Sequence, residues 1–279
     1  MLGIEITLGS GPGWSGSGGP WVQPQQSMQH LVFSEVEARG PQQFNKVLPV
    51  PKQRSTVWHS MRSDFYEDVA TFAFPAYKPA IANSDEKALY VRDPYTSKPG
   101  VRTRFPAKAD YAEPDRPQII SPATIIDLSS LVQADGRLVW EVPEGEWTIL
   151  RMGRRPTGAT SRPAPLPGVG LECDKFDAAA FDAHFDQYIG KSLKKVGPRK
   201  PNTGWTMLHI DNWEMGAQNW TPQLSDEFKQ RRGYDMRPYL PAFSGRIVGS
   251  LEKTERFLWD LRMTCQELVL QNHAGHLNK

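Results

Sequence analysis

The order of apolar and polar residues divides the chain into parts with different periods. Near the start, IEITLGSG (4–11) is an apolar, strand-like run that leads directly into the glycine-rich stretch GSGPGWSGSGGPW. From about residue 49 to 156, short runs typical of β-strands are separated by Pro, Gly, Asp and Ser, and no helical period is sustained. The pattern predicts a β-rich, sandwich-like middle part.

The last part of the chain alternates strand and helix patterns. An apolar run in GVGLECDKFD (168–177) predicts a strand, and Asp177 is a candidate N-cap for the helix that follows. WTMLHI (205–210) predicts a buried strand, Thr221 a second helix start, and Ser250 a third. Strand, helix, strand, helix is typical of a parallel α/β sheet.

These patterns predict an α/β fold: an incomplete (β/α)8 TIM-type barrel with a β-rich, sandwich-like insert. Residues 1–48 are expected to form the first part of a catalytic barrel with its glycine-rich loop, and 49–156 the insert. Residues 157–279 are expected to continue the barrel and to stop before its remaining strands, because a complete barrel takes about 250 residues.

Polar and aromatic residues gather where strands are expected to end. HIDNWEMGAQNWTP (209–222) places acids, amides and indoles directly after one apolar run, and active sites of parallel α/β folds form at the carboxyl ends of strands. The stretch is therefore a candidate site. Candidate substrate-binding residues are Asp211, Trp213, Gln218, Asn219, Trp220, Glu172, Asp174, Trp14 and Trp21.

Two further sets of residues leave alternatives open. Glu172 and Asp174 alternate by two, so in an extended chain they point the same way and suit calcium or sugar hydroxyls; the alternative is an acidic pair compensated by Lys175. His209 is interpreted as a buried, hydrogen-bonded histidine, with substrate or metal contact as the alternative. The candidate metal ligands are His209 and Glu172.

Composition narrows the function classes. With 33 basic against 31 acidic residues the net charge is +2, which gives no electrostatic case for nucleic acid. No apolar run approaches the roughly 20 residues of a membrane span. Two distant cysteines, Cys173 and Cys265, are expected to be buried free thiols, and no signal peptide is visible at the start.

Four stretches in order resemble the α-L-rhamnosidases of glycoside hydrolase family 106. They are LGSGPGWSGSGGPWV (8–22), GLECDKFD (170–177), HIDNWEMGAQNWTP (209–222) and FKQRRGYDMRPYLPAFSGRIVGSLEKTERFLWDLR (228–262). The resemblance implies a (β/α)8 barrel with β-sandwich domains, a calcium ion at the site, and hydrolysis of rhamnose-containing glycosides with inversion. The resemblance is compatible with the periplasm or the cell exterior, but the sequence assigns no compartment.

The resemblance assigns the general acid to Glu214 and the base to a glutamate well over a hundred residues further on. A general acid must stay protonated near neutral pH, so its pKa must be raised. Trp213, Met215 and Asp211 lie close enough in sequence to raise the pKa of Glu214. The alternatives are a structural carboxylate at Glu214 and an Asx-type turn at Asp211.

The sequence therefore favours an inverting α-L-rhamnosidase whose base glutamate is missing from these 279 residues, so that the chain alone is nearly inactive. Two alternatives remain. One is a truncated, non-catalytic carbohydrate-binding fragment, and the other is a retaining barrel glycosidase, whose carboxylates would lie only ~5–5.5 Å apart.

Overall fold

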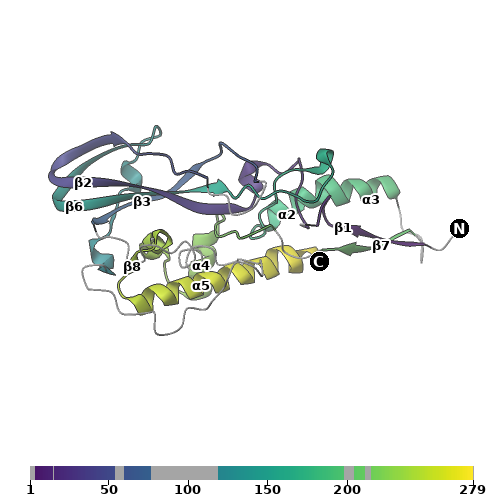
Figure 1. Ribbon diagram of the computed structural model, residues 1–279. Helices are drawn as coiled ribbons and strands as arrows, with labels where there is room; N and C mark the ends of the chain where they lie inside the picture. Colours follow the sequence, from purple (N-terminus) through teal and green to yellow (C-terminus); the bar gives the residue numbers. More distant parts are fainter. Residues whose placement is uncertain are drawn as a thin grey trace.

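The computed structural model describes residues 4–14, 16–53, 60–76, 119–197, 204–210 and 215–278. The molecule is elongated. A β-sheet lies at one end, a pair of parallel strands with both chain termini nearby lies at the other, and the long helix α5 (Leu251–Val269) runs beneath the sheet (Figure 1).

The largest sheet of the described chain is antiparallel. Its strands are β2 (Gln29–Val47), β6 (Arg137–Pro156), β3 (Glu67–Pro75) and β5 (Ile126–Asp127), in the order β2-β6-β3-β5. β2 and β6 pair along nearly their whole length. The β-rich part therefore begins at Gln29, and the predicted boundary at residue 49 is wrong.

One Pro- and Gly-containing stretch, expected to separate two short strands, does not separate them. PEGE (143–146) lies inside the single strand β6, where Gly145 has φ +110° and the register with β2 shifts between Gly40 and Gln42. The glycine accommodates an irregularity in a long strand rather than a reversal of the chain. The described residues form no second antiparallel sheet, so the sandwich predicted for this part is not seen there.

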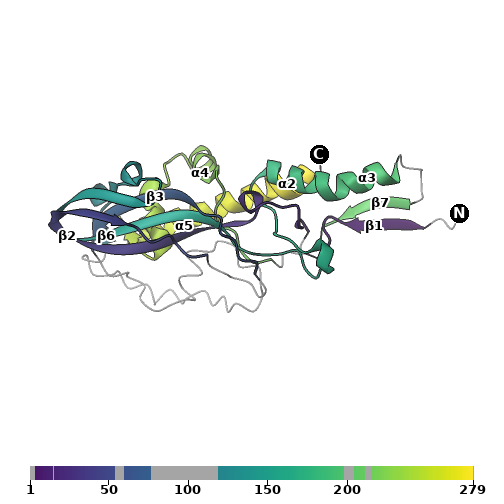
Figure 2. The same ribbon diagram turned by 90° about the horizontal axis from the view of Figure 1, so that it is seen from above.

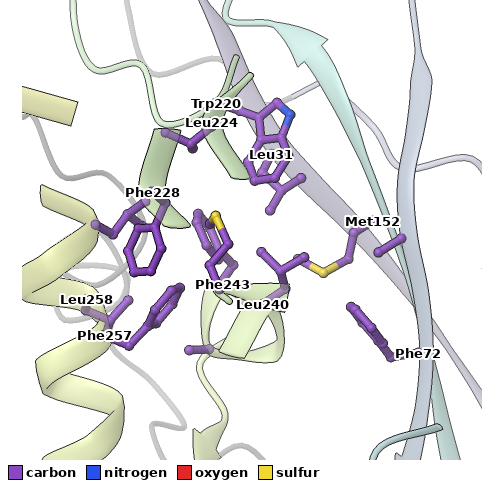
Figure 3. Close-up of a cluster of buried hydrophobic side chains, with 14 of the residues drawn as sticks. Leu31, Phe72, Met152, Trp220, Leu224, Phe228, Leu240, Phe243, Phe257 and Leu258 are labelled. Carbon is purple, nitrogen blue, oxygen red and sulfur yellow. The ribbon is translucent and has the colours of Figure 1, made fainter. Parts of the chain in front are cut away.

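Helices, not a second sheet, cover one face of this sheet. Alternate residues of the central strands, such as Phe72 and Met152, face side chains from α4 (Leu224–Arg232), the 3₁₀ helix η8 (Arg237–Ser244) and α5 in one buried cluster (Figure 3). The opposite face holds a second cluster. Its buried residues are Ala38, Phe44, Leu48, Ala73, Leu128, Leu138, Trp140, Val142 and Ile149.

Local signals predicted several helix ends. The Asp177 side chain accepts a hydrogen bond from the Ala179 N–H at 2.9 Å before α2 (Ala178–Phe185), and the Ser250 hydroxyl accepts one from the Lys253 N–H at 3.1 Å before α5. Both N-cap predictions are confirmed. Beyond α2 the helix continues as a π-helical segment (Asp186–Gly190) and α3 (Lys191–Val196). Beyond α5 it continues as a second π-helical segment (Leu270–Ala274) and α6 (Gly275–Leu277).

β1 (Glu5–Gly9) and β7 (Gly204–His209) form a parallel pair beside α2 and α3, far from the large sheet (Figure 2). Both strands were expected, but Ile6 and Met207 are 52% and 57% exposed, so their predicted burial is wrong for this chain. The other parallel pair is β4 (Ile119–Ile120) with β8 (Ile247–Val248). The described residues thus contain parallel pairs but no closed barrel.

Shorter 3₁₀ turns complete the described chain, at Pro24–Gln26, Pro122–Thr124, Ser129–Leu131 and Leu166–Gly168. Cys173 and Cys265 are free and buried, as predicted. Within the described ranges, no helix combines the length and the hydrophobicity that crossing a membrane requires.

Candidate active site

The exits of β1 and β7 lie side by side. The Ser10 N–H donates to the His209 carbonyl at 2.8 Å, and a Cβ on Gly16 would lie 3.5 Å from Cγ2 of Ile210. The glycine-rich loop thus contacts the start of the 209–222 stretch, as expected for two neighbouring parallel strands. His209 is exposed, so the interpretation as a buried histidine is wrong.

Three predicted site residues, Asp211, Trp213 and Glu214, lie outside the described residues. Their roles stay predictions. The chain is described again at Met215, which is 2% exposed and packs with Met28 and Ala159 in a small apolar cluster. The described neighbours on either side, Ile210 and Met215, therefore lie beside the glycine-rich loop and beside Ala159, respectively.

The segment around Glu172 is not a strand of a parallel sheet, contrary to the prediction. Its residues make single antiparallel bridges instead: Leu171 with Thr160, Glu172 with Gly18, and Cys173 with Ser27. The apolar run does form an extended segment. Its bridge partners are loop residues from distant parts of the chain, and a local sequence pattern does not specify them.

Glu172 and Lys175 form a buried ion pair. Both side chains are fully buried, and Lys175 Nζ lies 2.8 Å from Glu172 Oε2 and donates to the Cys173 carbonyl at 3.0 Å. Burial alone would lower the pKa of Lys175, but the Glu172 carboxylate, together with Cys173 and Asp174, outweighs it and holds that pKa above its usual value. The ion pair thus lies against Gly18 of the glycine-rich loop.

This pair bears on the calcium ion that the family resemblance implies. A buried ammonium beside Glu172 repels a second cation, and His209 lies exposed at a strand end. Across the described ranges no group of three or more His, Cys, Asp and Glu side chains could hold a metal ion. Glu172 and His209 therefore do not fit as a calcium site, and calcium itself stays a prediction.

Asp174 and Gln218 connect the 172–176 segment to the 209–222 stretch. Gln218 Nε2 donates to Asp174 Oδ1 and to the Trp220 carbonyl, and Gln218 Oε1 accepts the Lys175 N–H at 3.1 Å. Both side chains are at most 1% exposed. In this structure the Asp174 and Gln218 side chains therefore contact each other, and the substrate contacts predicted for them are not seen.

Burial also sets the charge state of Asp174. It raises the pKa of the carboxyl to about 6, although hydrogen bonds from Thr221, Gln218 and the Phe176 N–H pull the other way. Thr221 was predicted to cap α4; its side chain instead bonds Asp174, and Gln223 takes the N-cap position without a side-chain bond.

This shift predicts a pH effect on stability. Because the folded pKa lies above the unfolded one, Asp174 adds stability that is full below about pH 4 and is lost as pH rises through about 6. The difference in unfolding free energy between wild type and Asp174→Asn should therefore fall across that window. Urea denaturation of both proteins at several pH values measures it, and a difference that rises or stays flat there would contradict the assignment.

Asn219 and Trp220 make contacts within the fold. The side chain of Asn219 accepts the Leu31 N–H at 2.8 Å, and the residue is 1% exposed. Trp220 is 3% exposed and lies in the core (Figure 3). Its predicted stacking on a sugar is wrong, because the core leaves no face of the ring open.

The two tryptophans of the glycine-rich loop differ. Trp14 is 57% exposed, so it stays a candidate wall for a ligand. Trp21 is partly buried, stacks on Tyr188 with ring centroids 5.5 Å apart, and donates its indole N–H to Nδ1 of His184 at 3.0 Å. Trp21 therefore attaches the loop to α2.

His184 and His273 are site-supporting residues that sequence reasoning missed. His184 Nε2 donates to the Ser10 carbonyl at 2.7 Å while Nδ1 accepts from Trp21, which fixes a neutral ring, and burial lowers its pKa. His273 lies 3.3 Å from the Ser17 hydroxyl, and burial together with nearby Lys175 lowers its pKa to about 3. Neither histidine has a distinctive sequence context.

Gly18 gives a direct test of this packing. A Cβ there would lie 2.5 Å from Glu172 Oε1 and 2.9 Å from the Leu171 carbonyl. Gly18→Ala should lower the free energy of unfolding by about 1–3 kcal/mol through overpacking. Gly9→Ala is the matched control, since its Cβ would meet only the Gly11 carbonyl at 3.4 Å. Equal denaturation midpoints for the two variants would show that the loop does not press on Glu172.

Three comparisons with known proteins bear on the family of this chain, and the names of the matching proteins differ. A family model described as alpha-L-rhamnosidase, glycoside hydrolase 106, matches residues 1–279. A protein of Formosa agariphila named "Putative beta-glucuronidase" is 38% identical over 277 residues, which cover 99% of this chain and 22% of that protein. The solved rhamnosidase structure from Novosphingobium sp. PP1Y has a TM-score of 0.74 and 26% identity, covering 98% of this chain and 38% of that one.

Proposed function

This chain belongs to glycoside hydrolase family 106, the alpha-L-rhamnosidases, and from that premise we propose that it carries the acid half of an α-L-rhamnosidase active site. The observation that carries the proposal is the match of the family model along all 279 residues, including the stretch that holds Glu214. The chain spans 22% of its curated relative and 38% of the solved rhamnosidase, so the activity is proposed for the product of the complete reading frame that contains this sequence.

The described residues support a site at this place. β1 and β7 are parallel and end together, and the 209–222 stretch begins at the end of β7. Met215, the residue after Glu214, packs against Met28 and Ala159. The proposal places the Glu214 carboxyl next to this apolar cluster, because apolar surroundings favour the protonated form that a general acid needs.

In the proposed reaction Glu214 protonates the glycosidic oxygen as the bond to rhamnose breaks. A second carboxylate, not assigned to any residue of this chain, takes a proton from water that attacks the opposite face of the sugar. Asp211 and Trp213 are proposed to contact the sugar. The buried Asp174–Gln218 contact holds the segment that follows Glu214, so these two act as positioning residues.

A substrate panel tests the activity. The complete protein should release p-nitrophenol from the α-L-rhamnoside and leave the β-D-glucuronide intact. The glucuronide is included because of the name of the Formosa agariphila relative. Hydrolysis of the glucuronide alone would contradict the proposed specificity for rhamnosides. Hydrolysis of neither substrate would favour the carbohydrate-binding alternative.

A further inference from the structure

The start of β2 packs against residues 215–220, the segment that follows the proposed acid. Met28, the residue before the strand, lies with Met215 in the small apolar cluster. The Gln29 carbonyl accepts the Trp220 N–H at 3.2 Å, and these two residues form an isolated antiparallel bridge. The start of the long strand therefore contacts this segment at both of the segment's ends.

His30 contacts the same segment between these two points. Its Nε2 lies 2.6 Å from the Ala217 carbonyl oxygen, and because a carbonyl only accepts, Nε2 is the donor. The next residue, Leu31, donates its N–H to the Asn219 side chain at 2.8 Å. His30 and Ala217 are each 2% exposed, so solvent does not take the place of the imidazole as the donor to this carbonyl.

The short length of chain between Ala217 and Glu214 couples this hydrogen bond to the proposed acid. Ala217 is the third residue after Glu214, and three residues span at most about 10 Å. Gly216 has φ +84°, in the left-handed region that favours glycine, so the backbone itself sets the direction of the chain next to Ala217. A shift of the Ala217 carbonyl would therefore be passed on to the residues just before it.

We propose that His30 is a positioning residue for Glu214, and that its hydrogen bond to the Ala217 carbonyl keeps the acid within reach of the glycosidic oxygen. Proton transfer requires the two heavy atoms to approach to ~2.6–3.2 Å, and a misplacement of about 1 Å can cost a rate of about 10²-fold. The inference rests on the proposed function, and it gives the antiparallel sheet a part in catalysis, because His30 belongs to β2.

Two amide variants of different length test the proposal in the complete protein. The Gln side chain of His30→Gln places an N–H near the position of Nε2, whereas that of His30→Asn is too short to reach the Ala217 carbonyl. His30→Asn should lower kcat for a rhamnoside with an unactivated leaving group by about 10–10²-fold and leave KM within about threefold. His30→Gln should keep kcat within about threefold of the wild type. Equal kcat values for the two variants would overturn the proposal.

A second substrate separates positioning of the acid from loss of folded protein. The leaving group of a 2,4-dinitrophenyl rhamnoside departs without protonation, so its hydrolysis does not need the acid in place. The ratio of kcat for the unactivated rhamnoside to kcat for this one is independent of the fraction of protein that is folded. His30→Asn should lower that ratio by about fivefold or more, and His30→Gln should preserve it. An unchanged ratio in His30→Asn would show that His30 only stabilises the fold.

Two further variants complete the experiment. His276→Gln is the control for a histidine lost elsewhere: its Nε2 lies 2.7 Å from Asp182 of α2, and the variant should preserve both kcat values within about twofold. Glu214→Gln separates this inference from the proposed function. An unchanged ratio in Glu214→Gln would remove the proposed acid, whatever the His30 variants do. A lowered ratio in Glu214→Gln with an unchanged ratio in His30→Asn would overturn the role of His30 alone.

Discussion

Replacing Glu214 with glutamine in the complete protein should lower kcat for an unactivated rhamnoside by about 10²–10⁴, the usual contribution of a positioned acid. Glutamine is nearly isosteric but cannot deliver a proton to the leaving oxygen. The loss should be much smaller with a 2,4-dinitrophenyl rhamnoside, because that leaving group departs without protonation. Steady-state rates on both substrates measure the two losses.

The matched control for this variant is Glu37→Gln, on the exposed part of β2. It removes one carboxylate of the same type and should leave both rates within twofold of the wild type. Near-normal turnover of the unactivated substrate by Glu214→Gln would remove Glu214 from the mechanism. An equal loss on both substrates would indicate a structural role in place of acid catalysis.

Replacing Lys175 with methionine should lower the free energy of unfolding by about 3–5 kcal/mol, because it leaves the Glu172 carboxylate buried without its cation. Both side chains are fully buried, so water cannot compensate without opening the fold. Replacing both residues with methionine should recover much of the loss, since an apolar pair of similar volume needs no desolvation of charge. Urea denaturation of the three proteins measures these differences.

Lys229→Met serves as the control, because Lys229 is an exposed lysine in α4. Its stability should stay within about 0.5 kcal/mol of the wild type, as for most surface substitutions. A Lys175→Met midpoint equal to that of Lys229→Met would contradict the buried ion pair and the arrangement of the 172–175 segment built on it.

Helix ends and strand starts were predictable because their causes are local. Asp177 and Ser250 cap helices with their own side chains, and the apolar spacing of α5 follows from one helix facing one core. The strands β1 and β7 were predicted from two apolar runs that end in glycine-rich or polar loops, whereas their pairing was not. Each of these signals is contained in a window shorter than about 20 residues.

The errors arose where a distant partner decides the outcome. Thr221 had the sequence context of an N-cap, yet its side chain bonds Asp174, and Trp220 was placed in the site by its neighbours but is buried by the sheet. For Glu172 the cause is local, and the structure shows the alternative that the sequence left open, compensation by Lys175 three residues away. The sequence suggested ligand-binding roles for Trp220 and Glu172, but in the structure their side chains make contacts within the protein.

The most direct test of the central claim is to identify which anomer of rhamnose is released first from p-nitrophenyl α-L-rhamnoside. Proton NMR of the complete protein's reaction, recorded before mutarotation, distinguishes the two anomers of rhamnose. The account predicts β-L-rhamnose as the first product, since a single displacement by water inverts the anomeric centre. First appearance of α-L-rhamnose would show a retaining double displacement, and no release of rhamnose would contradict a rhamnosidase site in this protein.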